Sequence, residues 1–590
     1  MQLRHFYKLF PTVLLCVGSA MLLHAQQMQW QWAVQSHGLK SESAGGIACD
    51  KAGNVYVTGS FADTASFGET LLTPQGQNDI FLAKYNAGGK LLWIKTAGGA
   101  GKDYAGALTV TPAGTLYIAG IAGHQAVFEN RTVGEKKQQL FIAAYTDEGA
   151  LLWVNTWPAL PGDYITSIAA DSSENGYFSG YFGKQLIFDA QHTITSNGKT
   201  DAFVLCVDST GVVQWVNQWG GDGHDKITAM QYVDDRLWLT GTCQSSMTVG
   251  NDEIIPSGRQ SVFTIRCTAD GKVVYAKKVA DGTQILPASI RQLSDTCIVL
   301  AGSFADSIRF AQDVRYSYGN HDIFVVMTDT SGNMRWVQQA GSYGYDRLFD
   351  ALPMSSSILL SGMYSGTLFV NNDTTSFHSR HGDLFNLALD YEGRPQWISS
   401  TRGRTEQYPV ALTHDTKGDV YVAGLFRDTL RVHRSILVAP TGSYNMFFAK
   451  LHNCDKHPLV FLNDTVFTEG SRLSLQLEGH YESYRWDYGQ ATTPTYEVTC
   501  GNVYHVRVTD SLHCVYRDST TIRTRPAKPA IQIRAEVQEK VRGAGFSSFS
   551  SFLNAETQLY AGLQPVPLRG LPSRPAPQQA RLTPYALWPS

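Results

Sequence analysis

The feature that most constrains this fold is an internal repeat that occurs seven times along the chain. An aromatic residue after a glycine turn, a glycine in a strand-like segment and a phenylalanine in another such segment recur in every copy. At nearly constant intervals, the aromatic series is Trp32, Trp93, Trp153, Trp215, Tyr275, Trp336 and Trp397. The period is about 61 residues, and self-similarity at a fixed period is the sequence signature of solenoids and propellers.

Each copy contains four short segments rich in β-branched and aromatic residues, separated by loops. In the third copy they cover 167–171, 176–182, 201–208 and 212–218. The last two are joined through Gly211, which can supply the positive φ that a tight hairpin needs. Four antiparallel strands in every copy predict a β-propeller, and a linear solenoid is the alternative.

The phase of the repeats predicts how such a ring would close. The chain begins with a lone fourth strand at 28–36, and the repeats end with a lone third strand at 445–451. The N-terminal strand would complete the last blade and remove free sheet edges, which promote aggregation. Because the range 26–452 then holds seven whole periods, we expect an all-β, seven-bladed β-propeller over this range.

The segments GNVYVTGSF (53–61) and DIFLAKYNAGGKLLWIKTAGG (79–99) resemble the SBBP-type β-propeller repeat of secreted Bacteroidetes proteins. The resemblance implies a secreted or surface-displayed propeller, and it supplies no catalytic residues. The segment 206–215 is similar to the tryptophan-docking motif of quinoprotein-type propellers, in which the tryptophan packs between blades. This second resemblance implies a structural inter-blade role for Trp93, Trp153, Trp215, Trp336 and Trp397, without a quinone cofactor.

The N-terminal segment 1–25 predicts a secretory signal peptide. Arg4 and Lys8 precede an apolar run that ends at Ala25, and cleavage after Ala20 is the alternative. No later stretch of about 18 apolar residues occurs, so we expect no transmembrane segment in the mature chain. We therefore expect a monomer that is secreted or displayed at the outer surface of the cell.

A carboxylate recurs in the loop before the first strand of six copies. The series is Glu42, Asp103, Asp163, Asp225, Asp346 and Glu406. One interpretation is structural, because a carboxylate in such a loop can accept backbone N–H hydrogen bonds and fix the turn. The other is an acidic ring lining one face of the propeller, which would attract a cation or a basic partner.

Charge and motifs limit the possible functions. The 48 Lys and Arg are outnumbered by 51 Asp and Glu, which argues against nucleic-acid binding because that requires a basic surface. The sequence contains no GxSxG elbow, no Walker loop and no CxxC pair, so we expect no catalytic residues, no cofactor and no metal site. The predicted function is non-enzymatic binding of a protein or glycan outside the cell. The alternative is a carbohydrate-active lyase or hydrolase with its site in the axial funnel.

The repeat period stops near residue 453. The segment YRWDYG and the later stretch YEVTCGNVYHVRVTDSLHC resemble PKD-type or Ig-like domains, which implies a small β-sandwich over 453–525. We expect Trp486 in its core. Cys500 and Cys514 flank one strand at a spacing that suits a disulfide, and Cys454 is the competing partner. The last segment, 526–590, is rich in Pro, Arg, Gln and Ala and predicts a disordered or frameshifted tail.

Overall fold

The computed structural model describes residues 28–526, apart from 135–137, 372, 433–434, 455–464, 469–470, 478, 487–491 and 512–513. The described part of the chain is all-β, and its strands pair in two separate sets, β1–β39 and β40–β45. The predicted signal peptide lies outside the described residues, and so does the predicted tail beyond Pro526.

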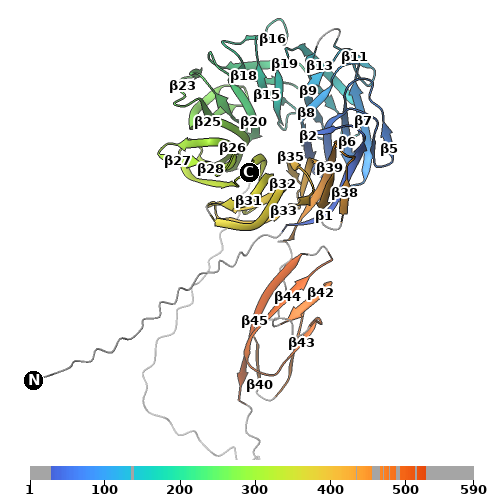
Figure 1. Ribbon diagram of the computed structural model, residues 1–590, viewed down its shortest axis with the longest axis vertical. Helices are drawn as coiled ribbons and strands as arrows, with labels where there is room; N and C mark the ends of the chain where they lie inside the picture. Colours follow the sequence, from blue (N-terminus) through green and yellow to red (C-terminus); the bar gives the residue numbers. More distant parts are fainter. Residues whose placement is uncertain are drawn as a thin grey trace, which may run out of the picture. The chain divides into compact units, whose positions relative to one another are not determined.

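The strands β1–β39 form antiparallel units of four strands, and Figure 1 shows these units following one another around a common centre. The first strands are β2 (Glu42–Cys49), β8 (Tyr104–Val110), β14 (Tyr164–Ala170), β20 (Lys226–Val233), the second half of β25 (Val273–Ser294), β30 (Arg347–Pro353) and β35 (Gln407–His414). The second strands are β3 (Val55–Phe61), β9 (Leu116–Ala122), β15 (Gly176–Phe182), β21 (Arg236–Cys243), β26 (Cys297–Phe310), β31 (Ser357–Val370) and β36 (Val420–Arg427).

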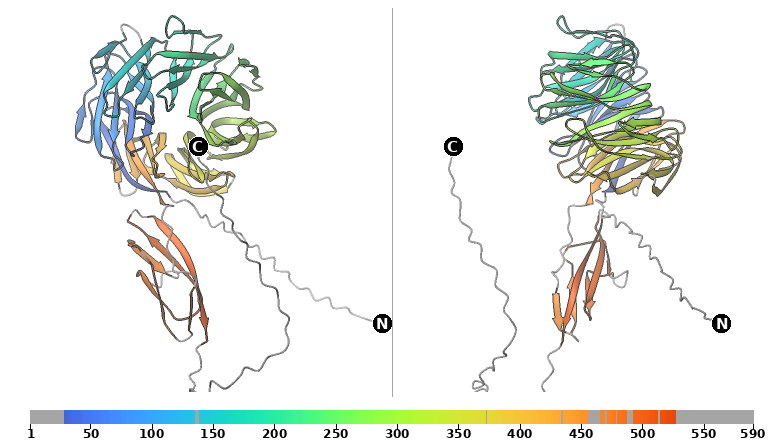
Figure 2. Two further views of the ribbon diagram at one scale, coloured as in Figure 1. Left: turned by 180° about the vertical axis from the view of Figure 1, so that it is seen from behind. Right: turned by 90° about the vertical axis from the view of Figure 1, so that its left-hand side faces the viewer.

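The third and fourth strands complete these units. The third strands are β6 (Asp79–Tyr85), β12 (Gln139–Tyr145), β18 (Asp201–Val207), β24 (Gln260–Thr268), β28 (Asp322–Asp329), β32 (Asp373–Asp390) and β39 (Tyr444–Asn453). The fourth strands are β7 (Leu91–Gly98), β13 (Leu151–Pro158), β19 (Val213–Trp219), the first half of β25, β29 (Met334–Gly341), β33 (Pro395–Ser400) and β1 (Met28–Gly38). Figure 2 shows the same arrangement from behind and from the side.

The N-terminal strand pairs with the last repeat, as the phase of the repeats predicted. β1 and β39 are antiparallel, from Met28 opposite Asn453 to Gln35 opposite Phe447. The strand labels in Figure 1 place β1 beside β39, although the two strands lie at opposite ends of the repeat region. Apolar side chains of the first unit also pack against those of the last, with Val55 and Phe81 in one cluster with Tyr421 and Phe448.

A short hairpin between the second and third strands is an element that the four-strand pattern did not predict. The separate hairpin strands are β4 (Ala65–Phe67), β5 (Thr70–Leu72), β10 (Ala126–Phe128), β11 (Arg131–Val133), β16 (Gln185–Ile187), β17 (Thr193–Thr195), β22 (Met247–Val249), β23 (Asp252–Ile254), β27 (Asp313–Tyr316), β37 (Thr429–Val432) and β38 (Ser435–Val438). Hairpin strand β4 pairs with β1, and β10 pairs with β7, while β37 pairs with the short β34 (Arg402–Gly403). These pairs add hydrogen bonds between successive units.

The second set of strands forms a four-stranded and a two-stranded sheet. Its members are β40 (Thr465–Thr468), β41 (Leu473–Gln476), β42 (Ser483–Trp486), β43 (Thr495–Val498), β44 (Asn502–Thr509) and β45 (Val515–Arg525). Both sheets contribute to one hydrophobic cluster, which contains Leu475, Val498 and Val506. Trp486 is fully buried in this cluster, as the sequence predicted.

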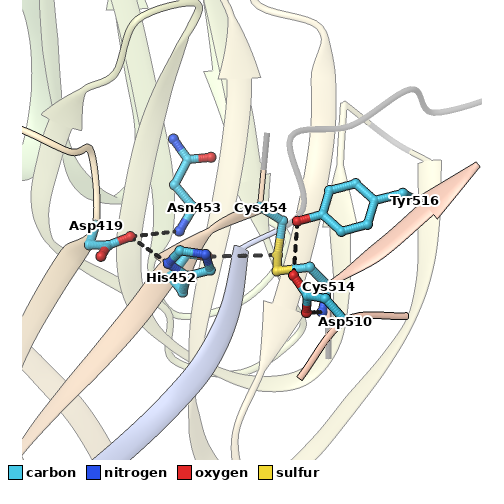
Figure 3. Close-up of a disulfide and its surroundings, with 7 residues drawn as sticks. All are labelled: Asp419, His452, Asn453, Cys454, Asp510, Cys514 and Tyr516. Atoms are coloured by element: carbon cyan, nitrogen blue, oxygen red, sulfur yellow. Dashed lines mark hydrogen bonds and ion pairs between the residues drawn. A yellow bond between two sulfur atoms is a disulfide. The ribbon is translucent and has the colours of Figure 1, made fainter. Parts of the chain in front are cut away.

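The predicted disulfide between Cys500 and Cys514 is wrong. Cys514 bonds instead to Cys454, with a Cα–Cα distance of 5.5 Å (Figure 3). Cys500 precedes β44 and Cys514 precedes β45, which pairs with β44 from Thr509 opposite Val515 onward. The two cysteines therefore lie at opposite ends of an eight-residue strand, roughly 25 Å apart. The number of intervening residues allowed the bond, but the register of the hairpin prevents it.

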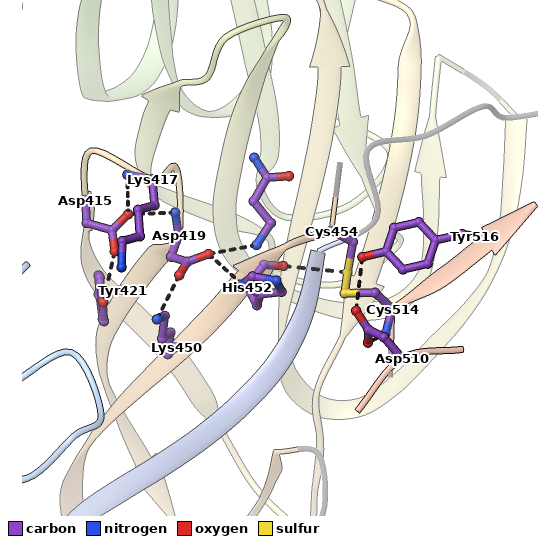
Figure 4. Close-up of polar contacts among 11 residues, drawn as sticks. Asp415, Lys417, Asp419, Tyr421, Lys450, His452, Cys454, Asp510, Cys514 and Tyr516 are labelled. Carbon is purple, nitrogen blue, oxygen red and sulfur yellow. Dashed lines mark hydrogen bonds and ion pairs between the residues drawn. A yellow bond between two sulfur atoms is a disulfide. The ribbon is translucent and has the colours of Figure 1, made fainter. Parts of the chain in front are cut away.

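The end of β39, directly before this disulfide, is held by a buried carboxylate. Asp419 lies 2.8 Å from Lys450 Nζ and 2.7 Å from His452 Nδ1, and it accepts the backbone N–H of Asn453 at 3.1 Å (Figure 4). Burial alone would raise the pKa of Asp419, but the hydrogen bonds from His452 and Lys450 hold that pKa well below its usual range. These contacts anchor the strand on which β1 docks.

Candidate functional site

A cavity of about 1040 Å³ is lined by the first strands of the successive units. Its volume lies just above the range of about 300–1,000 Å³ that is typical of ligand pockets. Small residues such as Gly45 and Ala107 form part of the wall. A Cβ at Gly45 would overlap the carbonyl oxygen of Ala105, so the close approach of β2 and β8 requires glycine there.

None of the six periodic carboxylates is among the described lining residues of this cavity, which argues against the alternative of an acidic ring on one face. The side chains of Glu42, Asp103, Asp163, Asp225 and Asp346 are buried. Asp103 accepts the backbone N–H groups of Gly99 at 3.0 Å and Gly123 at 2.6 Å. Asp225 does the same with Gly221 at 2.8 Å and Gln244 at 3.0 Å. These five residues therefore fit the structural interpretation, in which a carboxylate fixes the loop by accepting hydrogen bonds.

The last member of the series departs from this pattern. Glu406 is exposed and accepts a hydrogen bond from the Tyr444 hydroxyl. The next residue, Gln407, is fully buried and takes the structural position, with its Oε1 2.7 Å from the Thr401 hydroxyl. The predicted series was therefore displaced by one residue in the last unit.

A second buried acidic series was not predicted. Asp79, Asp201 and Asp322 begin their third strands, and each precedes the acid of the next unit, Asp103, Asp225 or Asp346, by the same interval. The residues just before each pair form parallel bridges, which are Asn78 with Lys102, Thr200 with His224, and His321 with Tyr345. The constant sequence interval between the two acids of each pair was the signal from which this contact between successive units could have been predicted.

The buried acids at the junctions have shifted proton affinities. Burial, with a smaller contribution from the charge of Asp322, raises the pKa of Asp346 to about 7, and burial raises the pKa of Asp322 to about 6. Burial also raises the pKa of Glu42 to about 7. Since these groups contact backbone and neighbouring side chains inside the wall, their role is to hold adjacent units together.

Several side chains that flank the buried acids reach the cavity. Successive side chains along a strand point to opposite sides, so a buried residue has neighbours that face outward. In two units Ile285 and Gln407 stand in place of the acid. The residues directly after this position are Ser43, Tyr104, Tyr164, Lys226, Leu286, Arg347 and Tyr408. Of these, Tyr104, Tyr164, Lys226, Leu286 and Arg347 line the cavity.

The cavity is cationic, although the whole chain has a net charge of −3. Lys102, Lys226 and Arg347 line it, and none of the three forms an ion pair with a carboxylate in the described part of the chain. Asp350 is the one acidic residue among the described lining residues, and it is paired with Arg291 at 3.0 Å. The uncompensated charge of the wall is therefore positive.

Aromatic rings lie beside two of these cations. Lys226 Nζ is 4.4 Å from the ring centroid of Tyr181, whose ring lies 5.6 Å from that of Tyr164. The Arg347 guanidinium is 4.7 Å from the ring of Phe349. Tyr164 is 38% exposed and Tyr104 is 37% exposed, so the cavity presents open aromatic surface together with positive charge.

The periodic tryptophans lie outside the cavity, at the contacts between units. The indole Nε1 atoms of Trp93, Trp153, Trp215 and Trp336 donate to a turn carbonyl of the following unit, at 2.8 to 3.2 Å. The rings pack beneath the turn glycine there, as Trp215 does beneath Gly271. Trp397 packs against the cluster that contains Val420 and Val422. No hairpin turn joins the third and fourth strands of that following unit, because β1 supplies its fourth strand.

Across the described ranges, no group of three His, Cys, Asp or Glu side chains is placed to hold a metal ion. In the same part of the chain, no helix has the length and hydropathy needed to cross a bilayer.

No protein-family model matches the chain. It is 20% identical over 500 residues to the "Uncharacterized WD repeat-containing protein L264" of Acanthamoeba polyphaga mimivirus, covering 67% of this chain and 36% of that protein. The chain thus spans about a third of the length of this curated relative.

Two solved structures are similar to this chain at low TM-scores. Hydrazine synthase of Kuenenia stuttgartiensis is 10% identical with a TM-score of 0.35, over 68% of this chain and 96% of that chain. A Synechocystis apocarotenoid oxygenase variant is 9% identical with a TM-score of 0.33, over 72% and 97%. At these scores the likeness does not bear on function. The WD-repeat relative, the internal repeat and the all-β units together indicate a β-propeller repeat protein.

Proposed function

We propose that this chain is a secreted, seven-bladed β-propeller that binds a ligand in its axial cavity without converting it. Seven copies of the repeat support the number of blades. Contacts between first strands run from β2 through β8, β14, β20, β25, β30 and β35, and β35 contacts β2 again. Together with the pairing of β1 and β39, this cycle supports a closed ring of the SBBP type.

The observation that carries the binding function is the lining of the axial cavity. Three cations without a carboxylate partner in the described chain, and tyrosines with open ring surface, face a volume of about 1040 Å³. Lys226 is half-buried with no carboxylate partner, which is unfavourable unless a ligand supplies one, whereas Lys102 and Arg347 are exposed and can reach a ligand in the cavity. A concave site with a few convergent polar groups is the usual form of a ligand pocket.

Export is supported by two separate features. The segment 1–25 has the pattern of a signal peptide, and the Cys454–Cys514 disulfide suits an oxidising compartment. The small sheets β40–β45 would then be a PKD-type or Ig-like spacer, which this disulfide ties to the end of the propeller.

An enzyme with its site in the cavity is the second candidate. A glycoside hydrolase uses two carboxyl groups about 5 to 9.5 Å apart, whereas the described lining holds Asp350 alone, already bound to Arg291. A lyase fits better, because Tyr104, Tyr164 or Lys226 could act as a general base next to cations that neutralise a carboxylate. Formation of an unsaturated sugar, followed by ultraviolet absorbance, would distinguish the lyase from a binding protein.

The binding function is tested with the purified full chain on a glycan array. Leu286 lines the cavity, so Leu286→Trp would fill part of it. Leu152 is 42% exposed and does not line the cavity, so Leu152→Trp is the matched control. We expect the array signal to be lost in the first variant and kept in the second, with equal melting temperatures. Equal signals from both variants would contradict a ligand site in the cavity.

A further inference from the structure

We propose that the ligand of the axial cavity is an acidic saccharide, whose uronate carboxylates bind the cavity cations and whose pyranose rings pack on the tyrosines. This inference rests on the proposed function, because it assigns a ligand class to the same cavity. It depends on where the cations and rings lie relative to one another.

Cation and ring occur side by side in two different units. Lys226 begins β20 and lies 4.4 Å from the ring of Tyr181 on β15, with Tyr164 on β14 next to it. Arg347 begins β30 and lies 4.7 Å from Phe349 on the same strand. A ligand that spans both places needs negative groups at intervals, with flat apolar surface between them. A chain of uronate sugars has this alternation.

The electrostatic environment favours a carboxylate ligand. Lys226 is partly removed from water, and this burial lowers its pKa. Asp350, the acid of the described lining, is occupied by Arg291, the Ser289 hydroxyl at 3.1 Å and the Leu412 N–H at 3.2 Å. A ligand carboxylate would supply the partner that the protein does not. Charge-assisted hydrogen bonds to it would be stronger than neutral ones.

The same features argue against a nucleic acid as the occupant. Binding to a phosphate backbone needs an extended basic surface, whereas this chain is acidic overall. The tyrosines Tyr104 and Tyr164 face a partly open cavity of limited volume. A short saccharide fits a volume of about 1040 Å³, and a long polyanion would extend over the acidic exterior.

The test is calorimetric titration of the full chain with trimers of galacturonate, glucuronate and mannuronate, and with the methyl ester of each. The ester keeps the pyranose rings and removes the charge. We expect at least one acid to bind and its ester to bind about tenfold or more weakly, since hydrogen bonds to charged groups contribute most. Raising the salt concentration should weaken the binding of the acid.

Two variants and one control locate the charge. Lys226→Gln and Arg347→Gln should each weaken binding of the acid by about tenfold or more. Lys272→Gln removes a cation that is exposed and does not line the cavity, and it should change affinity by less than about twofold. Unchanged melting temperatures show that the variants fold.

Each other outcome overturns the inference in a recognisable way. If acid and ester bind equally and Leu286→Trp abolishes both, the cavity binds a neutral sugar and the proposed function stands alone. If no uronate binds but a single-stranded DNA oligonucleotide does, the ligand is a nucleic acid. If neither the trimers nor any glycan on the array binds, the inference and the proposed function both fail.

Discussion

Two neighbouring junctions, at which one four-stranded unit packs on the next, are stabilised by different kinds of side chain. Between β19 and β20, Asp225 is fully buried and binds the backbone of both flanking loops. At the next junction β25 runs without interruption from Val273 to Ser294, and fully buried Ile285 stands in the place of the carboxylate. One junction is held by a buried carboxylate, whereas the other has an apolar side chain at that position and is continuous as a single strand.

Each of the two units that meet between β19 and β20 contains one tyrosine–tryptophan pair, but the two residues exchange positions. Tyr177 of β15 lies 6.1 Å from Trp215 of β19, and the Tyr177 hydroxyl donates to Asp171 at 3.0 Å. In the following unit the residues are exchanged, so that Trp238 of β21 lies 5.9 Å from Tyr275. Trp238 Nε1 donates to Gln292 Oε1 at 2.7 Å. Both units therefore contain one tyrosine ring and one tryptophan ring, on exchanged strands. The junction requires the combined volume of the two rings and not a particular residue at each position.

The largest effect is expected where β1 pairs with β39, because these two strands come from opposite ends of the repeat region. Deleting β1, residues 28–38, removes the strand that pairs with β39 and the packing of Trp32 on Phe448. Globular proteins are stable by only about 5–15 kcal/mol, so the variant should fail to fold or aggregate through the exposed edge of β39. Circular dichroism and size-exclusion chromatography measure this. A deletion that melts like the parent would show that β1 does not close the ring.

The next effect concerns a single ring of the polar junction. Trp215→Ala should destabilise the fold by about 3–5 kcal/mol, because it leaves a cavity beneath Gly271 and removes the hydrogen bond to the Ala269 carbonyl. Chemical unfolding measures the loss. Leu152→Trp, a substitution at an exposed position, is the control for surface changes. A loss of ligand binding without any loss of stability would contradict the structural role.

The comparison of junctions shows what the sequence could and could not predict. The period predicted the strands, the pairing of β1 with β39 and the placement of Trp215, because each depends on apolar side chains at regular spacing. It also found Asp225, but not that the flanking His224 and Lys226 would reach the cavity while Asp225 itself is buried. Spacing identifies a position, and the direction of a side chain depends on the pleat of the strand.

Elements without a period were missed or predicted wrongly. Hairpin strands such as β4 and β10 have three residues each, too few for an alternation to be recognised. The disulfide partner of Cys514 depended on the register of β44 and β45, which the residue count did not define. Both cases involve contacts between segments whose relative placement only the folded chain determines.

A smaller effect is expected from exchanging the aromatic pair of the polar junction. Tyr177→Trp alone and Trp215→Tyr alone each disturb the packed volume. The double variant restores it in the order already present at Trp238 and Tyr275. We expect the double variant to be more stable than the sum of the single changes by about 0.5–3 kcal/mol, as for residues in contact. Strictly additive changes in unfolding free energy would show that the exchanged order is not equivalent.

The last expected effect distinguishes the two kinds of junction by pH. Asp346 belongs to a polar junction, and burial raises its pKa to about 7, above the value of about 4 expected in the unfolded chain. The folded state therefore binds this proton more tightly. Its contribution to stability is complete below pH about 4 and is lost as the pH rises through about 7.

We therefore expect the unfolding free energy to fall as the pH rises from about 4 to about 7, and Asp346→Asn to flatten this dependence. Ile285→Val provides the contrast, since shortening a buried apolar side chain should cost about 0.5–1.5 kcal/mol at every pH without changing the slope. Urea unfolding of the three proteins across this pH range measures both quantities. If Asp346→Asn keeps the slope of the parent, the proton is bound elsewhere, and Asp322 and Glu42, whose pKa values are raised to about 6 and 7, are the next groups to substitute. A change of slope in Ile285→Val would mean that the apolar junction is coupled to the titrating ones, and the two junctions would no longer be independent.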